Sequence, residues 1–353
     1  MKSIKTVLVT GGAGYIGSHT CLYLIEQGYK VIVIDSLVNS SLKSLERIKV
    51  ILKKNNHRNL ISLKVHEGSL VNKEFIDSVF QQALSEGNKI DAVIHFAGFK
   101  SVKESVHNPF IYWQNNVIGT INLVSVMNKY ICNKIVFSSS ATIYKANNID
   151  RITEKFEIGP INPYGNTKRV NEVFLSDVFK SNKFKWGIIN LRYFNPIGAH
   201  PSGLIGESPK GIPNNIFPIL MNIAHDKKQC LEVFGNDWPT RDGTCIRDYI
   251  HITDLAQGHI KALEFLNKSS SINLSINLGT GKGTSVLELI KTFEDNNRIK
   301  LNYTFSKRRE GDAPIVVADN TVAKEILNWV PKKSIAEMCK DGWNWKLKNP
   351  NGY

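Results

Sequence analysis

The feature that most constrains the fold is a glycine-rich turn near the start of the chain. The β-branched run 7–10 leads directly into the segment GGAGYIG at 11–17, and a longer amphipathic stretch follows. Glycine is needed in such a segment for the tight turn, for close approach of the backbone to a phosphate group and for close helix-to-strand packing. Strand, glycine turn and helix in this order predict a dinucleotide-binding unit.

An acidic residue stands where the second strand of this unit should end. Asp35 closes the run 30–35 and lies 18 residues after Gly17. A carboxylate there accepts hydrogen bonds from adenosine ribose hydroxyls and repels a 2′-phosphate, while the helix N-terminus supplies N–H donors for the pyrophosphate. The expected cofactor is therefore NAD and not NADP.

The first half of the chain alternates short β-branched runs with amphipathic stretches, which is typical of a parallel sheet covered by helices on both faces. The expected strands are 4–10, 30–35, 60–66, 91–96, 134–138, 187–191 and 275–278, and the expected helices include 14–27, 72–86, 109–128, 254–266, 321–329 and 335–347. This pattern predicts an α/β fold, a Rossmann-type doubly wound parallel sheet with a smaller α/β substrate-binding domain.

Turn-rich sequence after Asn195-Pro196 marks the expected crossing into the smaller domain. We expect a nucleotide-binding domain at 1–195, to which 248–279 returns. We expect the smaller domain to comprise 196–247 and 280–353.

The net charge of +14, from 45 Lys and Arg against 31 Asp and Glu, raises the question of a polyanionic partner. The basic residues are dispersed, with no run of five, so we expect a solvated surface and no nucleic-acid partner. No apolar run approaches the roughly 18 residues of a membrane-spanning helix. Five scattered cysteines without C-x-x-C spacing predict neither a disulfide framework nor a metal site, and favour a reducing, cytoplasmic location.

A candidate acid/base unit follows Pro163. Tyr164 and Lys168 lie four residues apart, on one face of an expected helix. Lowering a tyrosine pKa by about 3 units requires about 4 kcal/mol, which an ammonium group and an oxidised nicotinamide could supply together. Strand 134–138 runs into Ser140, at the edge of the sheet where ligands bind. For Ser138 and Ser139 we expect plain turn capping.

With these residues in place, the chain resembles the extended short-chain dehydrogenase/reductase family, and within it the 4-epimerases of UDP-glucose and UDP-galactose. The resemblance runs from Lys5 to the last residue. It rests on the segments TGGAGYIGSHT at 10–20, HFAGFK at 95–100, FSSSAT at 137–142, LRYFNPIGAHPSG at 191–203, GIPNN at 211–215, FGND at 234–237, RDYIHI at 247–252 and RREGD at 308–312.

The resemblance implies an isomerase that holds NAD tightly and passes through a transient 4-keto sugar. Tyr164 would act as the base on the 4-hydroxyl, Ser140 would hydrogen-bond the same oxygen, and Lys168 would hold the nicotinamide ribose. It also implies a homodimer in which helices near 109–128 and 163–179 pair across a two-fold axis. The implied partners are a UDP-sugar substrate and a second copy of the chain.

The family pattern also implies the remaining site residues. The cofactor residues are Gly11, Gly14, Tyr15, Ile16, Gly17, Asp35, Ser36, Asn39, Ser40, Ser69, Leu70, Phe96, Ala97, Gly98, Lys100, Asn115, Tyr164, Lys168 and Phe194. The substrate residues are Ser140, Tyr164, Asn195, Asn215, Phe234, Arg247, Arg309, Asp312 and Val316.

Three positions depart from the family pattern. Ser69 stands where an Asp commonly contacts adenine, and the lost charge-assisted bond is expected to weaken NAD binding by about 1 kcal/mol. Lys145 replaces a usual Gly, and the sequence offers no account of it. Val316 stands where members strict for UDP-glucose and UDP-galactose tend to have Tyr, so an N-acetylated sugar such as UDP-GlcNAc or UDP-GalNAc is a second expected substrate class.

Two other functions are compatible with the scaffold. A nucleotide-sugar 4,6-dehydratase would need an Asp-Glu pair after the active hydroxyl, and Ala141-Thr142 stands there instead. A non-catalytic dinucleotide-binding regulator, or a nucleic-acid-binding protein on the same scaffold, would usually lose the tyrosine or the lysine, and this chain keeps both.

Overall fold

The architecture was analysed in a computed structural model. The structure describes residues 5–55, 63–145, 151–181, 185–211, 213, 215–226, 230–269, 271–309 and 311–353. Residues 60–62 of the expected strand 60–66, and residue 4 of the expected first strand, lie outside this part of the chain.

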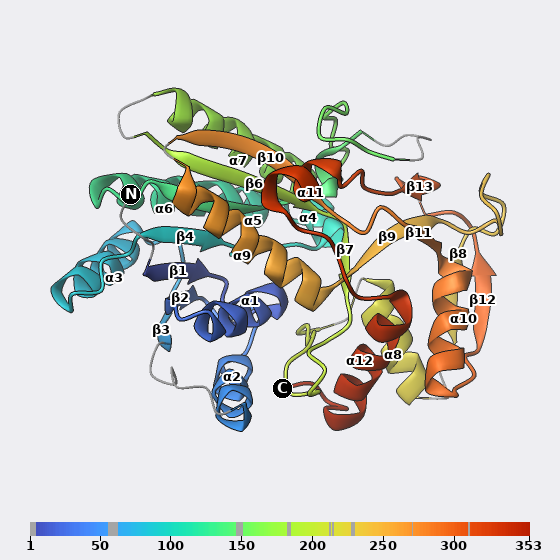
Figure 1. Ribbon diagram of the computed structural model, residues 1–353. Helices are drawn as coiled ribbons and strands as arrows, with labels where there is room; N and C mark the ends of the chain where they lie inside the picture. Colours follow the sequence, from blue (N-terminus) through green and yellow to red (C-terminus); the bar gives the residue numbers. More distant parts are fainter. Residues whose placement is uncertain are drawn as a thin grey trace.

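A seven-stranded sheet forms the larger part of the molecule, with every neighbouring pair parallel (Figure 1). Its strand order is β10-β6-β5-β4-β1-β2-β3. The strands are β1 (Thr6–Thr10), β2 (Lys30–Asp35), β3 (Leu63–Glu67), β4 (Ala92–His95), β5 (Lys134–Ser140), β6 (Gly187–Tyr193) and β10 (Ile272–Leu278). This is the doubly wound order, which confirms the predicted fold class.

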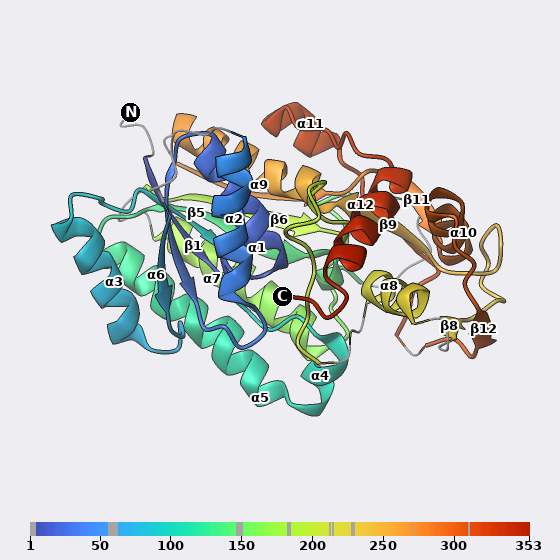
Figure 2. The same cartoon turned by 90° about the horizontal axis from the view of Figure 1, so that it is seen from below.

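Helices cover both faces of this sheet (Figure 2). The alternation along β1 sets the two faces: Val7 and Val9 pack toward one layer of helices and Leu8 toward the other. The first layer contains α1 (Tyr15–Glu26), α2 (Leu42–Lys54), α9 (Ile252–Lys268) and α11 (Thr321–Leu327). The second contains α3 (Lys73–Ser85), α6 (Gly119–Lys129) and α7 (Pro163–Lys180).

The expected continuous helix at 109–128 is divided in the structure. Helix α4 (Val102–His107) precedes α5 (Pro109–Tyr112), and a π-helical stretch, η1 (Trp113–Ile118), joins α5 to α6. A short 3-10 turn, η2 (Ala141–Ile143), follows β5. The sequence pattern placed these helical residues well but could not show the change in hydrogen bonding, because π and α turns share similar side-chain periodicity.

The smaller part packs beyond the carboxyl edge of the large sheet (Figure 1). One small sheet contains β7 (Asn195–Ile197), β9 (Ile246–His251), β11 (Gly283–Ser285) and β13 (Ile315–Val316), and a second pairs β8 (Leu231–Phe234) with β12 (Tyr303–Ser306). The helices α8 (Ile216–His225), α10 (Val286–Asn297) and α12 (Ile335–Lys348) share a separate core cluster with β7, β8 and β9.

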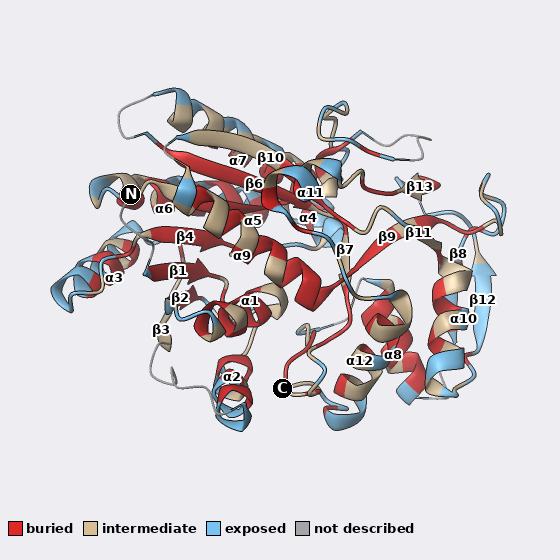
Figure 3. Cartoon of the chain, in the orientation of Figure 1, coloured by how far each residue is buried: buried red, intermediate tan, exposed pale blue. Residues whose placement is uncertain are grey.

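Strand β10 pairs with β6 at the edge of the sheet, although 85 residues separate the paired positions Leu278 and Tyr193. Burial differs between the two parts: the central strands of the large sheet are buried throughout, whereas β12 is exposed (Figure 3). Because β10 returns to the large sheet, we propose one domain of residues 1–195 with 248–279 and a second of residues 196–247 with 280–353.

Candidate active site

The glycine turn forms a tight cradle at the carboxyl end of β1. Gly11 has φ +71°, and a Cβ atom there would lie 2.8 Å from the backbone nitrogen of Ala97. A Cβ atom on Gly17 would overlap the backbone carbonyl of Gly11. Helix α1 begins at Tyr15 with no side chain capping its first turn. Its leading N–H groups therefore face the cradle without an intrahelical partner, as a pyrophosphate site requires.

Asp35 is fixed at the end of β2 by three hydrogen bonds. Its carboxylate accepts the backbone N–H of Ala13 at 2.9 Å, the N–H of Leu37 at 2.9 Å and the hydroxyl of Ser40 at 2.7 Å. A carboxylate has about four acceptor positions, so capacity for a ribose hydroxyl remains. The bond to Ala13 ties the carboxylate directly to the glycine cradle.

Ser140, Tyr164 and Lys168 come together at the carboxyl edge of the sheet. Ser140 ends β5, and the other two side chains lie one turn apart near the start of α7; all three residues are buried. The Lys168 ammonium donates to the carbonyl oxygen of Ser138 at 2.6 Å and lies 5.9 Å from the centre of the Tyr164 ring. The fold therefore brings a hydroxyl, a phenol and an ammonium group together in one site.

Burial favours the neutral phenol of Tyr164, whereas a role as a base needs the phenolate. Burial raises the pKa of Tyr164 to about 12, against an opposing hydrogen bond with Ser140. Burial also lowers the pKa of Lys168 to about 8, against the opposing charge of Glu172. An ammonium group at 6 Å stabilises a phenolate by about 3 kcal/mol at an effective dielectric constant of 20. Because burial works against the phenolate, a low tyrosine pKa requires a further positive charge beside the ring.

Several other expected cofactor residues lie around the cradle. The backbone N–H groups of Phe96 and Ala97 both donate to Thr10, which holds this loop against Gly11. Asn39 accepts the N–H of Lys210, and Asn115 donates to the carbonyl of Ile111. Four further expected residues lie in the same group of loops and helix starts. Leu70 is buried, Ile16 is half-buried, and Ser36 and Gly98 are exposed.

Two of these residues connect the cradle to the smaller part of the molecule. Lys100 forms an ion pair of 2.9 Å with the buried carboxylate of Glu207. The Tyr15 hydroxyl donates to the carbonyl of Gly198 at 2.6 Å. No sequence signal pointed to Glu207, since it lies in a turn-rich segment far from the glycine motif.

The expected diphosphate residues form a second cluster. Asp312 pairs with Arg309 at 2.8 Å and with Arg247 at 3.5 Å, and the Arg309 guanidinium lies 5.9 Å from the centre of the Phe234 ring. Arg309 is 56% exposed at its side chain, whereas Arg247 is mostly buried. Two guanidinium groups and an aromatic face are therefore available to one ligand.

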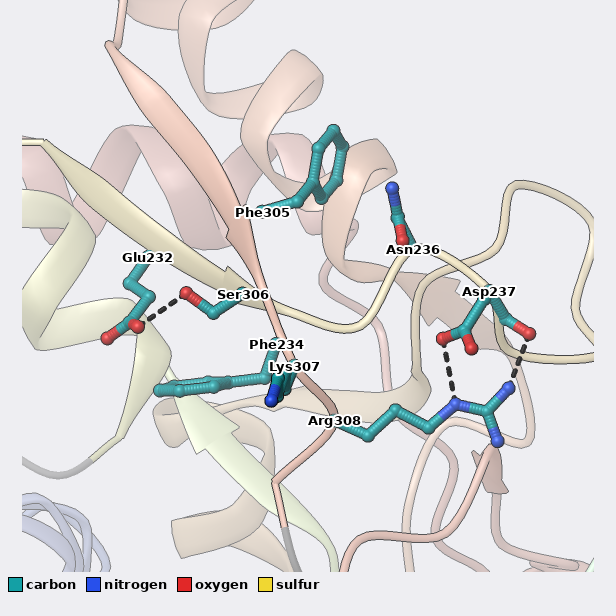
Figure 4. Close-up of a pocket in the computed structure, with 8 residues that line it drawn as sticks. All are labelled: Glu232, Phe234, Asn236, Asp237, Phe305, Ser306, Lys307 and Arg308. Carbon is teal, nitrogen blue, oxygen red and sulfur yellow. Dashed lines mark hydrogen bonds and ion pairs between the residues drawn. The ribbon is translucent and has the colours of Figure 1, made fainter.

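A surface hollow adjoins this cluster on strands β8 and β12 (Figure 4). Phe234 lines it, and Arg308 crosses its rim to pair with Asp237 at 2.8 Å. The hollow does not include Ser140, Tyr164 or Lys168, and Phe234 is the one expected substrate residue among the described residues that line it.

The remaining expected substrate residues lie between the two clusters. Asn195 begins β7, and Val316 lies on β13, beside Arg247 of β9 in register. Val316 also packs against the cluster that contains Phe194 and Tyr144. Asn215 precedes α8 and is exposed, with no side-chain bond to that helix.

Two departures from the family pattern have local explanations. The Ser69 hydroxyl accepts the N–H of Val71 at 3.2 Å, so it fixes the turn before α3. The Lys145 side chain is exposed and forms an ion pair of 2.9 Å with Glu157. A side chain is therefore accommodated at position 145 on the surface, away from the buried cluster of Tyr144.

The expectation of plain turn capping for Ser138 and Ser139 is wrong. Both lie within β5 and are buried. Ser138 hydrogen-bonds the Tyr193 hydroxyl, and the Ser139 hydroxyl donates to Glu172 at 2.5 Å. Strand pairing with β6 carries the serine run into the sheet, which the short β-branched core of the strand did not predict.

Glu172 and Arg192 were missed by reasoning from the sequence. Glu172 does carry a signal, because it continues the spacing of Tyr164 and Lys168 by four residues along one helical face. Arg192 carries none, since a lone arginine at the end of a strand is usually a surface residue. Within the described parts of the chain, no group of three or more metal-binding side chains occurs, and no helix is long and apolar enough to cross a membrane.

A doubly wound sheet, a glycine cradle with an acidic residue on the next strand, and a buried Ser, Tyr and Lys together define a short-chain dehydrogenase/reductase. Residues 8–342 match the family model described as GDP-mannose 4,6 dehydratase. UDP-glucose 4-epimerase of Bacillus subtilis (strain 168) is 49% identical over 347 residues, which cover 98% of each chain.

Solved structures give the same answer. The UDP-glucose 4-epimerase of Bifidobacterium longum, in complex with NAD+ and UDP, is 42% identical with a TM-score of 0.91, over 99% of this chain and 100% of that one. The enzyme of Stenotrophomonas maltophila, with bound NAD and formylated UDP-arabinopyranose, is 39% identical with a TM-score of 0.92, over 98% and 99%. The chain belongs to the UDP-glucose 4-epimerases of the extended short-chain dehydrogenase/reductase family.

Proposed function

We propose that the protein interconverts UDP-glucose and UDP-galactose at C4, with NAD as a tightly bound cofactor and a transient 4-keto sugar. The observation that carries the proposal is the buried Ser140, Tyr164 and Lys168 set beside the glycine cradle. Similarity to UDP-glucose 4-epimerases along the whole chain supports it.

The residues of the cradle fit NAD. Gly11 and Gly17 leave room where a Cβ atom would collide with backbone, and the first N–H groups of α1 face that room. The Asp35 carboxylate has capacity for a ribose hydroxyl and repels a 2′-phosphate. When bound, NAD supplies the acceptor for the C4 hydride and the positive charge that favours a phenolate.

The chain's own groups handle the proton. The Tyr164 oxygen takes the proton of the sugar 4-hydroxyl and returns it after the sugar has turned. The Ser140 hydroxyl, already hydrogen-bonded to that phenol, bonds the same sugar oxygen. The Lys168 ammonium adds a positive charge about one helical turn away. Each group is buried, so its electrostatic effect is stronger than in water.

The diphosphate anchor lies at a distance from this proton transfer. Arg247 and Arg309 exchange part of their pairing with Asp312 for the pyrophosphate, and Phe234 presents an aromatic face beside the uracil ring. Binding energy from this remote part of the ligand keeps the keto sugar from leaving while it rotates.

Dehydration is disfavoured although the matching family model carries a dehydratase's name. Ala141 and Thr142 follow Ser140, and neither is an acid or a base. The Thr142 hydroxyl donates to Ser140 at 3.0 Å and so supports that serine. Removal of a C5 proton and protonation of a leaving oxygen would need titratable groups at this place.

The experiment that tests the function is incubation with UDP-galactose, with the products resolved by chromatography. UDP-glucose should form without added reductant, and NAD should stay with the protein. The Tyr164→Phe variant should keep NAD and lose about 10²- to 10⁴-fold in kcat, because the proton acceptor is gone. Release of water from the sugar, or no change in it, would contradict the proposal.

N-acetylated sugars are proposed as a second substrate class. Val316 is half-buried beside Phe194 and Tyr144, and its side chain is smaller than the tyrosine of strict members, which favours space for an acetamido group. UDP-GlcNAc should therefore be converted, and Val316→Tyr should remove that conversion while UDP-galactose still turns over. Turnover of UDP-galactose by the native chain without any conversion of UDP-GlcNAc would exclude this substrate class.

A homodimer is proposed on the apolar surface beside α7. Helices α4 and α5 pack next to α7, and this side exposes Val106, Phe110, Trp113 and Val173. Phe110 is 85% exposed, which is unusual for so large an apolar side chain. Sedimentation should give twice the chain mass, and Phe110→Asp should reduce it. A cytoplasmic location remains a prediction from the scattered cysteines.

A further inference from the structure

A buried ion pair lies one helical turn beyond Lys168, the last of the candidate catalytic residues on α7. Glu172 follows Tyr164 and Lys168 on the same face of α7, and Arg192 reaches it from β6. Their side chains are only 11% and 8% exposed. Removing two charges from water is costly, and such a pair is often replaceable by apolar residues without loss of stability. Its presence here therefore suggests a role besides stability.

The contacts of Glu172 join three elements. Its two carboxylate oxygens accept the Arg192 guanidinium at 2.6 and 3.0 Å. One of them also accepts the hydroxyl of Ser139, the residue before Ser140. The carboxylate thus ties α7, which carries Tyr164 and Lys168, to the strand end that carries Ser140. Arg192 extends the tie to the Tyr144 hydroxyl at 3.1 Å.

We propose that Glu172 is a positioning residue that fixes the catalytic helix against the end of β5 and keeps Lys168 as an ammonium ion during turnover. The inference rests on the proposed epimerase function, because it assigns the residue a part in that reaction. Glu172 bonds Ser139 and lies one helical turn beyond Lys168, so it acts on the reaction through these two residues.

The groups around Lys168 make Glu172 the negative charge that supports it. Burial holds the pKa of His95, on β4, at about 3, so this imidazole stays neutral. Burial also raises the pKa values of Tyr164 and of Tyr193, which lies on β6, so without NAD neither phenol supplies a negative charge to Lys168 near pH 8. Arg192 is positively charged throughout. Against the desolvation that lowers the pKa of Lys168, Glu172 supplies the opposing charge.

The test compares Glu172→Gln with Glu172→Asp in the holoenzyme, as pH profiles of kcat for UDP-galactose. Gln keeps the shape and the acceptor oxygen but removes the charge, so Lys168 loses its proton at lower pH. The alkaline limb of kcat should move down by about one pH unit. At pH 8.5 kcat should fall about tenfold, and at pH 6.5 by threefold or less. Asp keeps the charge and should leave the limb within about 0.3 pH unit of the native one.

A matched control is Glu86→Gln, which breaks an exposed ion pair with Lys64 in the same half of the molecule. It should change neither kcat nor the limb. A Glu172→Gln limb equal to the native one would overturn the proposal, even if the variant melts at lower temperature, since a purely structural pair predicts that result. If the native chain does not turn over UDP-galactose at all, the proposed function has failed instead.

Ser139→Ala covers the case in which Glu172→Gln does not fold. This variant keeps every charge and removes only the link to β5. We expect kcat to fall about fivefold with KM for UDP-galactose and the alkaline limb unchanged. A native kcat in Ser139→Ala would contradict the positioning role.

Discussion

The two ligand-binding regions of this protein are built in different ways. The cofactor region consists mainly of backbone and of side chains that are already fixed: Gly11 and Gly17 leave the room, and Asp35 holds three internal hydrogen bonds. The proposed diphosphate region consists of long charged side chains that pair with one another. Asp312 serves Arg247 and Arg309, and Arg309 is more than half exposed.

The two constructions bind their ligands in different ways. A cradle of backbone N–H groups needs no rearrangement, so its ligand meets donors that are already oriented. The arginines must give up part of an ion pair before they hold a pyrophosphate, which lowers the net gain but permits exchange. A cofactor that stays and a substrate that leaves fit these two constructions.

The largest effect is expected in the cofactor region. Gly17→Ala places a methyl group against the Gly11 carbonyl and the Gly12 backbone, which cannot move without opening the cradle. NAD affinity should fall at least about 100-fold, measured as NAD retained after gel filtration. Gly87→Ala is the control: no atom lies within 4 Å of a Cβ there, and the strain of a side chain at φ +71° affects stability away from the cradle and not NAD retention. Full NAD retention in Gly17→Ala would show that the cradle is not preformed.

Acid should weaken the cofactor half more than the other. Burial lowers the pKa of His19 and of His95 to about 3, so the unfolded chain binds more protons between about pH 6.5 and 3. Stability should therefore fall as pH drops below 6.5, by about 1.4 kcal/mol per pH unit for each histidine. In the other half, burial lowers the pKa of one histidine, His200, to about 4, while Glu288, whose pKa a hydrogen bond from Arg241 lowers, keeps its contribution until lower pH; this half should therefore lose less stability over the same range.

Amide hydrogen exchange at pH 7.5 and 5.5 measures this difference. After correction for intrinsic exchange, β1 and β4 should lose protection at pH 5.5 while α10 keeps most of its own. Equal loss of protection in both halves would mean that they open as one unit and do not differ in acid stability.

A smaller effect is expected in the diphosphate region. Arg309→Ala should raise the Kd of UDP about tenfold, because one charge-assisted bond to phosphate is lost from an exposed site. Its neighbour Arg308 pairs with Asp237 and offers a matched control, so Arg308→Ala should change the Kd less than twofold. Calorimetric titration with UDP measures both. Equal effects would indicate general attraction by positive charge.

The smallest effect is a gain. Ser69→Asp restores a carboxylate where relatives commonly place one beside adenine. NAD should bind about fivefold more tightly, equivalent to about 1 kcal/mol. Ser78→Asp on the exposed face of α3 is the control and should leave NAD affinity unchanged. Weaker binding in Ser69→Asp would show that the turn made by Ser69 with Val71 matters more than the added charge.

Local sequence signals predicted the cofactor half better than the substrate half. The glycine turn and Asp35 lie within one βαβ unit, so their spacing along the chain fixes their spacing in space. Strand-to-helix alternation likewise predicted the large sheet. The small strands β7, β8, β9, β11 and β13 were not predicted, since they are short and pair with partners far along the chain.

The doubly wound class, the glycine cradle, the helical spacing of Tyr164 and Lys168, and the family could all be read from the amino-acid sequence. Three features became visible only in the folded chain: Ser138 and Ser139 lie inside a strand, Glu172 pairs with Arg192, and Lys100 pairs with Glu207. These two groups of features differ in how far along the chain the interacting residues lie. Turns, caps and helical faces depend on neighbours within a few residues, whereas a buried charge is defined by the partner that packing brings to it.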